Sequence, residues 1–178
     1  NNRKLTLDNS NTYIDLSSIA KGYAVDIIVD FLFEQGFTDF MVEIGGEIRC
    51  KGSNNQKDWI IGIINPLDEY DLIKTNISNL AIATSGNYNN YTIYEGVRYS
   101  HIINPKTGWP INNNIVSASV IAENCIDADA IATILMLLPY KKGISLIDKM
   151  KNVESLLFVK KDDKIVMITS KNFNKYLY

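Results

Sequence analysis

The sequence has few of the residues that mark several common classes of binding site. It contains two cysteines, Cys50 and Cys125, which lie far apart with no second cysteine near either, so a structural zinc site is excluded while a disulfide stays undecided. Lys and Arg number 18 against 20 Asp and Glu. Without a basic excess no nucleic-acid partner is expected, because such partners are held largely through their phosphates.

Long apolar runs are also missing. The longest uncharged one extends from Ala130 to Leu138, about half of the ~18 residues that a membrane-spanning helix needs. The chain is therefore expected to be soluble as it stands, and because it opens at Asn1 without a signal-type segment, any targeting signal would lie upstream. Its length and its 46% share of hydrophobic residues suit one compact core, so residues 1–178 are expected to form a single domain.

Three helices are predicted from the spacing of apolar residues. The first is indicated by apolar side chains at every fourth position, namely Ile19, Tyr23, Ile27 and Phe31. Ser17 and Ser18 precede it as candidate N-caps, and Gly36 follows as a stop signal. The second helix is expected at 127–138, directly before Pro139, and the third at 142–150.

Strand patterns occupy much of the remaining chain. They are predicted at 40–44, 47–51, 59–64, 80–84, 91–94, 97–103, 115–122, 155–159 and 165–169. A bend at Gly45 and Gly46 separates the first two. Residues 1–11 are expected to form a short strand and a turn, and the segment between 64 and 80 an irregular acidic connection. The hairpin-like spacing indicates a largely antiparallel sheet.

Asp129 and Thr133 form a candidate metal site. They are four residues apart on a predicted helix, which places a carboxylate and a hydroxyl on one face, one turn apart. Mg²⁺ favours oxygen ligands and needs only one or two protein carboxylates when waters and substrate phosphates complete its shell. The alternative is structural: an aspartate favoured by the helix dipole and a threonine bonded back to a backbone carbonyl.

The start of the first predicted helix is a candidate anion site. Ser17, Ser18 and Lys21 could present amides, hydroxyls and one ammonium group to a phosphate, although capping by the serines and a solvated lysine would explain the same residues. Gly45 and Gly86 could let the backbone approach a ligand closely or serve only as bends. The spacing required by a P-loop or a GxGxxG fingerprint is absent.

His101 is the single histidine and the candidate general base. It ends a predicted strand directly before a strong turn signal at Asn104–Gly108, where a rigid strand would present it to a cleft. The competing interpretation is a structural histidine, because no carboxylate adjacent in sequence indicates how the ring would be oriented.

Five motifs, in this order, resemble the ApbE family of FAD:protein FMN transferases: DLSSIAKGYAVD (Asp15–Asp26), GGE (Gly45–Glu47), ATSGNY (Ala83–Tyr88), HIINPKTGWP (His101–Pro110) and ADAIAT (Ala128–Thr133). The resemblance covers most of the chain, whereas the family's N-terminal portion is missing. It implies an α+β, T-fold-like architecture, which is compatible with the helices and antiparallel hairpins predicted above. Trp109 and Ile131 are mild departures from the family pattern that we expect to be tolerated.

The resemblance also implies a role for individual residues. Mg²⁺ would be held by Asp129, by Thr133 and by the backbone carbonyl of Ser18. Asp15 and Lys21 would contact FAD. The site for the flavin would be lined by Thr84, Ser85, Gly86, His101 and Ile102, with His101 acting as the base for the acceptor.

The implied activity is a Mg²⁺-dependent transfer of FMN from FAD to a threonine of an acceptor protein, with release of AMP. Family acceptors resemble small flavoprotein subunits of membrane electron-transfer complexes, with the threonine after a short Asp/Ser-Gly-x motif. Family members resemble lipid-anchored proteins outside the cytoplasmic membrane, and such an anchor would lie upstream of this sequence. Two alternatives stay open: an FAD pyrophosphatase that uses water, and a non-catalytic FAD-binding module.

Overall fold

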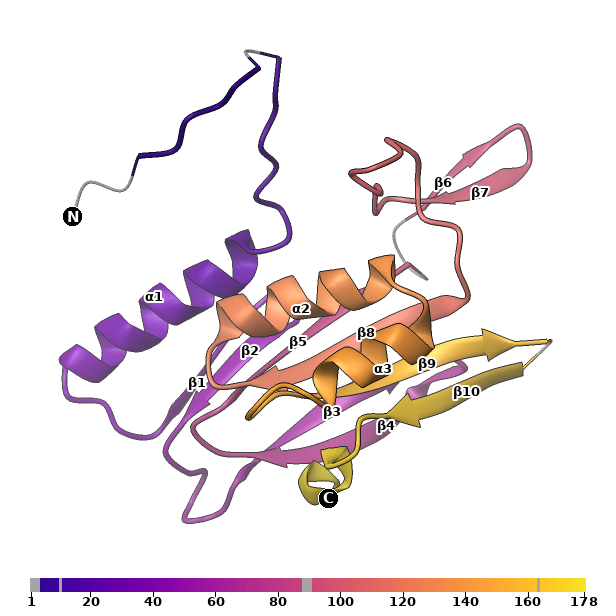
Figure 1. Ribbon diagram of the computed structural model, residues 1–178. Helices are drawn as coiled ribbons and strands as arrows, with labels where there is room; N and C mark the ends of the chain where they lie inside the picture. The colour runs from indigo at the N-terminus through magenta and orange to yellow at the C-terminus, as the bar shows by residue number, and fades with distance from the viewer. Residues whose placement is uncertain (1–3, 10, 88–90, 163) are drawn as a thin grey trace.

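A six-stranded antiparallel sheet forms the centre of the protein (Figure 1). The computed structural model describes residues 4–9, 11–87, 91–162 and 164–178. The sheet has the order β1-β2-β5-β8-β9-β10, and its strands are Phe40–Ile44, Glu47–Lys51, Ala81–Gly86, Ile115–Ala122, Glu154–Lys161 and Lys164–Thr169. All strand pairs are antiparallel, which confirms the predicted sheet type and, with the helices, the α+β class.

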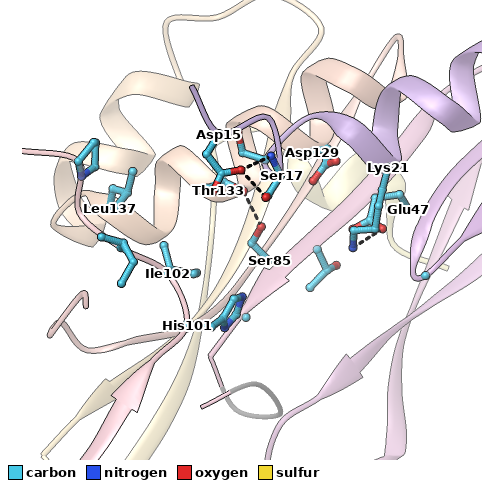
Figure 2. A pocket seen from close by; sticks show the side chains of 16 residues that line it. Asp15, Ser17, Lys21, Glu47, Ser85, His101, Ile102, Asp129, Thr133 and Leu137 are labelled. Carbon is cyan, nitrogen blue, oxygen red and sulfur yellow. Dashed lines mark hydrogen bonds and ion pairs between the residues drawn. The ribbon is translucent and has the colours of Figure 1, made fainter. Parts of the chain in front are cut away.

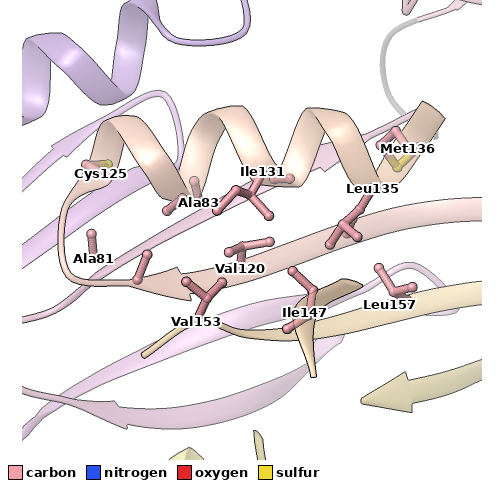
Figure 3. Packing of buried hydrophobic residues seen from close by; sticks show 14 of the residues in the cluster. Ala81, Ala83, Val120, Cys125, Ile131, Leu135, Met136, Ile147, Val153 and Leu157 are labelled. Carbon is pink, nitrogen blue, oxygen red and sulfur yellow. The ribbon is translucent and has the colours of Figure 1, made fainter. Parts of the chain in front are cut away.

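Three helices cover one face of this sheet (Figure 1). They are α1 (Ala20–Glu34), α2 (Cys125–Leu137) and α3 (Tyr140–Ile147). The main core lies between α2 and strands β5, β8 and β9, where Figure 3 shows side chains such as Leu135, Val120 and Leu157 interleaved. All three are fully buried, so this layer contributes a large share of the hydrophobic stabilisation.

A separate hairpin packs on the opposite face of the sheet (Figure 1). Its strands are β3 (Trp59–Asn65) and β4 (Asp68–Ile77), and a short 3-10 helix, η1 (Phe173–Tyr176), lies beside them. The second core cluster fills the space between hairpin and sheet and includes Ile61, Ile77, Phe158 and Phe173. The prediction of an irregular connection after residue 64 is therefore wrong. This segment is rich in charged residues, but it pairs with β3 and forms the ten-residue strand β4.

The remaining short elements lie around the ends of the sheet. A small hairpin, β6 (Tyr91–Tyr94) and β7 (Val97–Ser100), projects beyond one end of the sheet (Figure 1). Gly45 and Gly46 form the two-residue turn between β1 and β2, with φ of 61° and 98°, values that favour glycine in such turns. Of the strand predicted within 1–11, the described residues contain none, and residues 1–3 and 10 lie outside the description.

The first helix begins later than its predicted caps. Its N-cap is Ile19, which makes no side-chain capping bond, so the expected capping by Ser17 or Ser18 is wrong. The ends of α2 and α3 differ from prediction by one to three residues, and α3 begins at Tyr140 directly after Pro139. Such shifts are usual, because helix ends depend on local hydrogen bonds that periodicity does not report.

Helices α1 and α2 cap each other where they cross. The Asp26 carboxylate of α1 accepts hydrogen bonds from the first two amides of α2, Cys125 N (2.9 Å) and Ile126 N (2.9 Å). In return, Asp129 Oδ2 of α2 accepts one from Gly22 N in the first turn of α1 (2.9 Å). Amides in a first helical turn have no partner within their helix, so each carboxylate satisfies groups that would otherwise be unpaired.

The apolar stripe that predicted α1 faces outward. Tyr23, Ile27 and Phe31 are 55%, 50% and 58% exposed, whereas Val25 and Asp26 on the other side are buried. The helix itself is confirmed, but the buried side is chosen by the crossing with α2 and not by the stripe.

Neither cysteine is bonded to the other. Cys50 and Cys125 are free and buried, and burial raises the pKa of the Cys50 thiol to about 12, so both are poor nucleophiles at neutral pH. Among the residues described, no helix combines the length and the apolar character needed to cross a membrane.

Replacing Gly22 by alanine is expected to destabilise the fold. A Cβ at this position would lie 2.4 Å from the Cys125 carbonyl oxygen and 2.9 Å from Asp129 Cβ, so the helices would have to separate. We expect the free energy of unfolding in urea to fall by about 1–3 kcal/mol. Gly143→Ala is the matched control, because its Cβ would meet only the movable Cδ2 of Leu135; equal effects of the two changes would contradict the close crossing.

Asp26→Asn is expected to destabilise the protein through the charge that it removes. Asp26 also accepts a bond from Arg49 Nη1 at 2.8 Å, and both side chains are largely buried. The change leaves Arg49 without its buried partner, which costs about 3 kcal/mol in comparable pairs. Asp30, 66% exposed and 3.6 Å from the same nitrogen, provides the control: Asp30→Asn should change the unfolding free energy by less than about 1 kcal/mol. If Asp26→Asn lowers the free energy of unfolding as little as Asp30→Asn does, the Asp26–Arg49 pair does not stabilise the fold as inferred.

Candidate active site

All ten residues to which the family resemblance assigns a role line one hollow of about 530 Å³ (Figure 2). They arrive from four places: the loop before α1 and its first turn, the end of β5, the segment after β7, and one face of α2. Segments separated by more than a hundred residues therefore meet at one point. The residues are Asp15, Ser18, Lys21, Thr84, Ser85, Gly86, His101, Ile102, Asp129 and Thr133.

Asp129 is one of two buried carboxylates in the hollow, the other being Glu47. Asp129 is 4% exposed, and its Oδ2 accepts the bond from Gly22 N described above. Among the described residues no group donates a hydrogen bond to its Oδ1. Burial raises the pKa of this carboxyl, although the Gly22 bond and the nearby Lys21 charge both lower it. The side chain is thus held firmly while one of its oxygens is available to a cation.

Hydroxyl groups line the floor beside Asp129. Thr133 Oγ1 lies 3.1 Å from Ser85 Oγ, which joins α2 to the end of β5 (Figure 2). Thr84 Oγ1 lies 2.7 Å from Ser119 Oγ on the neighbouring strand β8. The sequence placed Thr133 one helical turn from Asp129, and the structure adds that Ser85 fixes its hydroxyl from the sheet.

Lys21 is held at the hollow by Glu47. Its Nζ lies 2.6 Å from Glu47 Oε2, and the glutamate side chain is 2% exposed while that of the lysine is 48% exposed (Figure 2). Burial raises the pKa of Glu47, Lys21 lowers it, and the Asp129 charge raises it further. Among the described groups, none gives Glu47 Oε2 a hydrogen bond of regular geometry. The Lys21 charge therefore offsets the cost of burying the negative charge at this oxygen.

Glu47 is the residue that sequence reasoning missed. It was quoted in the motif Gly45–Glu47 but received no role, because a carboxylate at the start of a strand is usually solvated. The signal was the glycine turn before it, which folds β2 back under Lys21: a Cβ on Gly45 would lie 3.5 Å from Lys21 Cδ.

The loop before α1 is organised by Asp15. Its Oδ1 accepts hydrogen bonds from Ser17 N (2.8 Å) and from the Ser17 hydroxyl. Both bonds lower the pKa of the exposed Asp15 carboxyl, and the bond from the Ser17 hydroxyl has the larger effect. Ser17 therefore shapes this loop and does not cap the helix.

His101 lies directly after β7, which ends at Ser100, so the strand predicted at 97–103 is too long and His101 is not part of it. The residue lies on the opposite wall from α1 (Figure 2). The segment after it is a closed turn in which Asn104 O accepts bonds from Thr107 N and Gly108 N, and Asn104 N donates to Trp109 O (2.8 Å). Its start is fastened by Ile111 N, which donates to Ile102 O at 2.9 Å. Tyr88, part of a quoted motif, lies outside the described residues.

Oxygen groups that could hold a cation such as Mg²⁺ meet at this site. Besides Asp129 Oδ1 and the Thr133 hydroxyl, the Ser18 carbonyl is available, because Gly22 N, which would bond to it in a regular helix, donates to Asp129 instead. Within the described part of the chain, no group of three His, Cys, Asp or Glu side chains could hold a metal ion. A cation here would need water or substrate oxygens as well, which is the usual arrangement for Mg²⁺.

Comparison with known proteins identifies relatives over nearly the whole chain. The model of the ApbE family matches residues 1–157. The FAD:protein FMN transferase of Vibrio cholerae is 43% identical over 176 residues, which are 97% of this chain and 52% of that protein. The protein of the same name from Haemophilus influenzae is 36% identical over 181 residues, 98% of this chain and 52% of its own length. The chain thus spans about half the length of these curated relatives.

Solved structures agree with the sequence comparison. The flavin transferase ApbE from Vibrio cholerae superposes with a TM-score of 0.82 at 43% identity, over 93% of this chain and 53% of that one. The ApbE protein from Thermotoga maritima gives a TM-score of 0.82 at 30% identity, with the same shares covered. The match of family model and structures, over the motifs that form the hollow, places this chain in the ApbE family.

Proposed function

We propose that the protein transfers FMN from FAD to a threonine side chain of an acceptor protein and releases AMP. The observation that carries the proposal is the convergence of two buried carboxylates, one ammonium group, several hydroxyls and one imidazole in a single hollow. Relatives named FAD:protein FMN transferase support both the substrate and the protein acceptor. Residues 1–178 would contribute this site as one domain.

The proposed role of the α1 side of the hollow is to bind the diphosphate of FAD. Lys21 would place its ammonium group, oriented by Glu47, against a phosphate oxygen, and Asp15 would contact the same substrate. Thr84, Ser85, Gly86 and Ile102 would line the place of the flavin. Mg²⁺, held by Asp129, Thr133 and the Ser18 carbonyl, would offset the negative charge of the diphosphate during transfer.

His101 would act on the acceptor. A threonine hydroxyl is a weak nucleophile at neutral pH, so we infer that the imidazole accepts its proton as the oxygen attacks the phosphorus on the FMN side. The new bond joins threonine oxygen to phosphorus, the bond from this phosphorus to the bridging oxygen breaks, and AMP leaves with that electron pair. Catalysis in phosphoryl transfer comes mainly from such positioning and charge stabilisation.

The acceptor and the location belong to the same proposal. We expect a flavoprotein subunit of a membrane electron-transfer complex, with its threonine after the short motif given above. The protein would then work outside the cytoplasmic membrane, held by a lipid anchor. Two other functions use the same groups: hydrolysis of FAD by water, which the metal and phosphate contacts also favour, and FAD binding without chemistry.

The transfer reaction can be followed by incubating the protein with FAD, Mg²⁺ and an acceptor domain that carries the threonine motif. We expect the acceptor to gain the mass of FMN, with one AMP released for each acceptor labelled. Asp129→Asn should lower this rate by about two orders of magnitude or more, because it keeps an acceptor for Gly22 N but removes the charge that attracts the cation. Chelation of Mg²⁺ should stop the wild-type reaction.

The matched control is Asp127→Asn, an exposed aspartate one half-turn away on the same helix. It should leave the rate unchanged. Release of AMP without labelling would replace the proposal by the hydrolase, and bound FAD without AMP would replace it by the binding module. Equal effects of both substitutions would remove Asp129 from the mechanism.

The Lys21–Glu47 pair predicts a coupled effect on FAD binding. Glu47→Gln keeps the shape of the side chain but removes the charge that orients the ammonium group, so we expect the Kd for FAD to rise about tenfold. In a Lys21→Met background the same change should have little effect, because the group that Glu47 orients is gone. Fluorescence titration gives the Kd for FAD of the wild type, the two single variants and the double variant. Additive effects on this Kd would mean that Glu47 does not act through Lys21.

A further inference from the structure

A second hollow, of about 250 Å³, lies beside the candidate active site. The two share a rim formed by two pairs of consecutive residues. Gly86 lines the first hollow and Asn87 the second, and His101 lines the first while Ser100 lines the second. A ligand that occupies the second hollow and extends over this rim therefore arrives at His101 and at the first hollow.

The second hollow has a lining unlike that of the first. Of the nine described residues that line it, four are asparagines, Asn87, Asn112, Asn113 and Asn114, and one, Lys160, is charged. Each carboxamide offers an acceptor oxygen and two N–H donors, the same groups that a peptide bond presents. Among the described residues that line it none is aromatic, whereas carboxamide groups suit hydrogen bonding to peptide groups.

Part of this lining is fixed and part is free. Asn113 Nδ2 donates to Met136 O (2.6 Å) and its Oδ1 accepts from Ile115 N (3.0 Å), so that side chain is a rigid wall. Asn112 and Asn114 are exposed, and within the described part of the chain their side chains make no hydrogen bond. These two side chains can therefore bind a ligand without breaking hydrogen bonds within the protein.

We propose that the second hollow binds an extended segment of the acceptor polypeptide. This inference rests on the proposed transferase function. Asn112 and Asn114 bond to peptide groups of the segment, and the chain then crosses the rim so that a hydroxyl side chain reaches His101. The exposed ammonium of Lys160, at the end of β9, favours a neutral or acidic segment and disfavours a basic one.

The test is direct binding of an acceptor domain in which the target threonine is replaced by alanine, so that no transfer occurs. Isothermal titration calorimetry with the full-length protein measures the Kd for this acceptor domain. The double variant Asn112→Ala/Asn114→Ala is expected to raise this Kd about tenfold or more through the loss of two or more hydrogen bonds, with the Kd for FAD unchanged. Asn174→Ala is the matched control, an exposed asparagine on η1 away from both hollows.

Charge gives a second, independent readout. Lys160→Glu should weaken binding of the same domain, whereas Lys160→Arg should retain it. The inference is overturned if the domain does not bind the wild-type protein, or if the double variant binds it as tightly as the Asn174→Ala control. Failure of the proposed function looks different: the unmodified acceptor binds, responds to these substitutions, and gains no FMN.

Discussion

The site depends on the reciprocal capping of α1 and α2. Asp26 takes the first amides of α2 while Asp129 takes the amide of Gly22, and the absence of a side chain at Gly22 lets the helices approach closely enough for both. This exchange has a consequence for chemistry. The Ser18 carbonyl loses its usual helical donor, and Ser18 lines the same hollow as Asp129. One packing contact thus leaves the Ser18 carbonyl and Asp129 Oδ1 as two candidate oxygen ligands.

Charge balance then explains the composition of the hollow. Asp129 and Glu47 are both buried, and the Asp129 charge adds to burial in raising the pKa of Glu47, while Lys21 is in contact with Glu47 and lowers that pKa. Two buried carboxylates beside one ammonium leave an excess of negative charge, which is costly unless a cation joins them. A cation bound beside these carboxylates would offset that excess, which is the role proposed above for Mg²⁺.

Local pattern in the sequence predicted most elements but not how they pack. The glycine turn at 45–46 and the strands on either side of it follow from residues close together in sequence, and they were predicted correctly. The outward face of α1 and the strand β4 were not, because both are decided by partners far away in the chain: α2 selects the buried side of α1, and β3 pairs with a segment too charged to resemble a strand. Asp26 has the pattern of a solvated aspartate, and its burial depends on amides about 100 residues away.

The site residues named from the family motifs line one hollow, whereas Glu47 needed the structure because its contact with Lys21 joins residues far apart in the sequence. The most direct test of the account is a crystal of the native-length protein grown with FAD and Mn²⁺ in place of Mg²⁺, in which anomalous scattering locates the metal. The account predicts a peak within about 2.0–2.3 Å of oxygens of Asp129 and Thr133, with the diphosphate on its other side. A metal bound elsewhere, or FAD bound with its diphosphate away from Asp129, would contradict it.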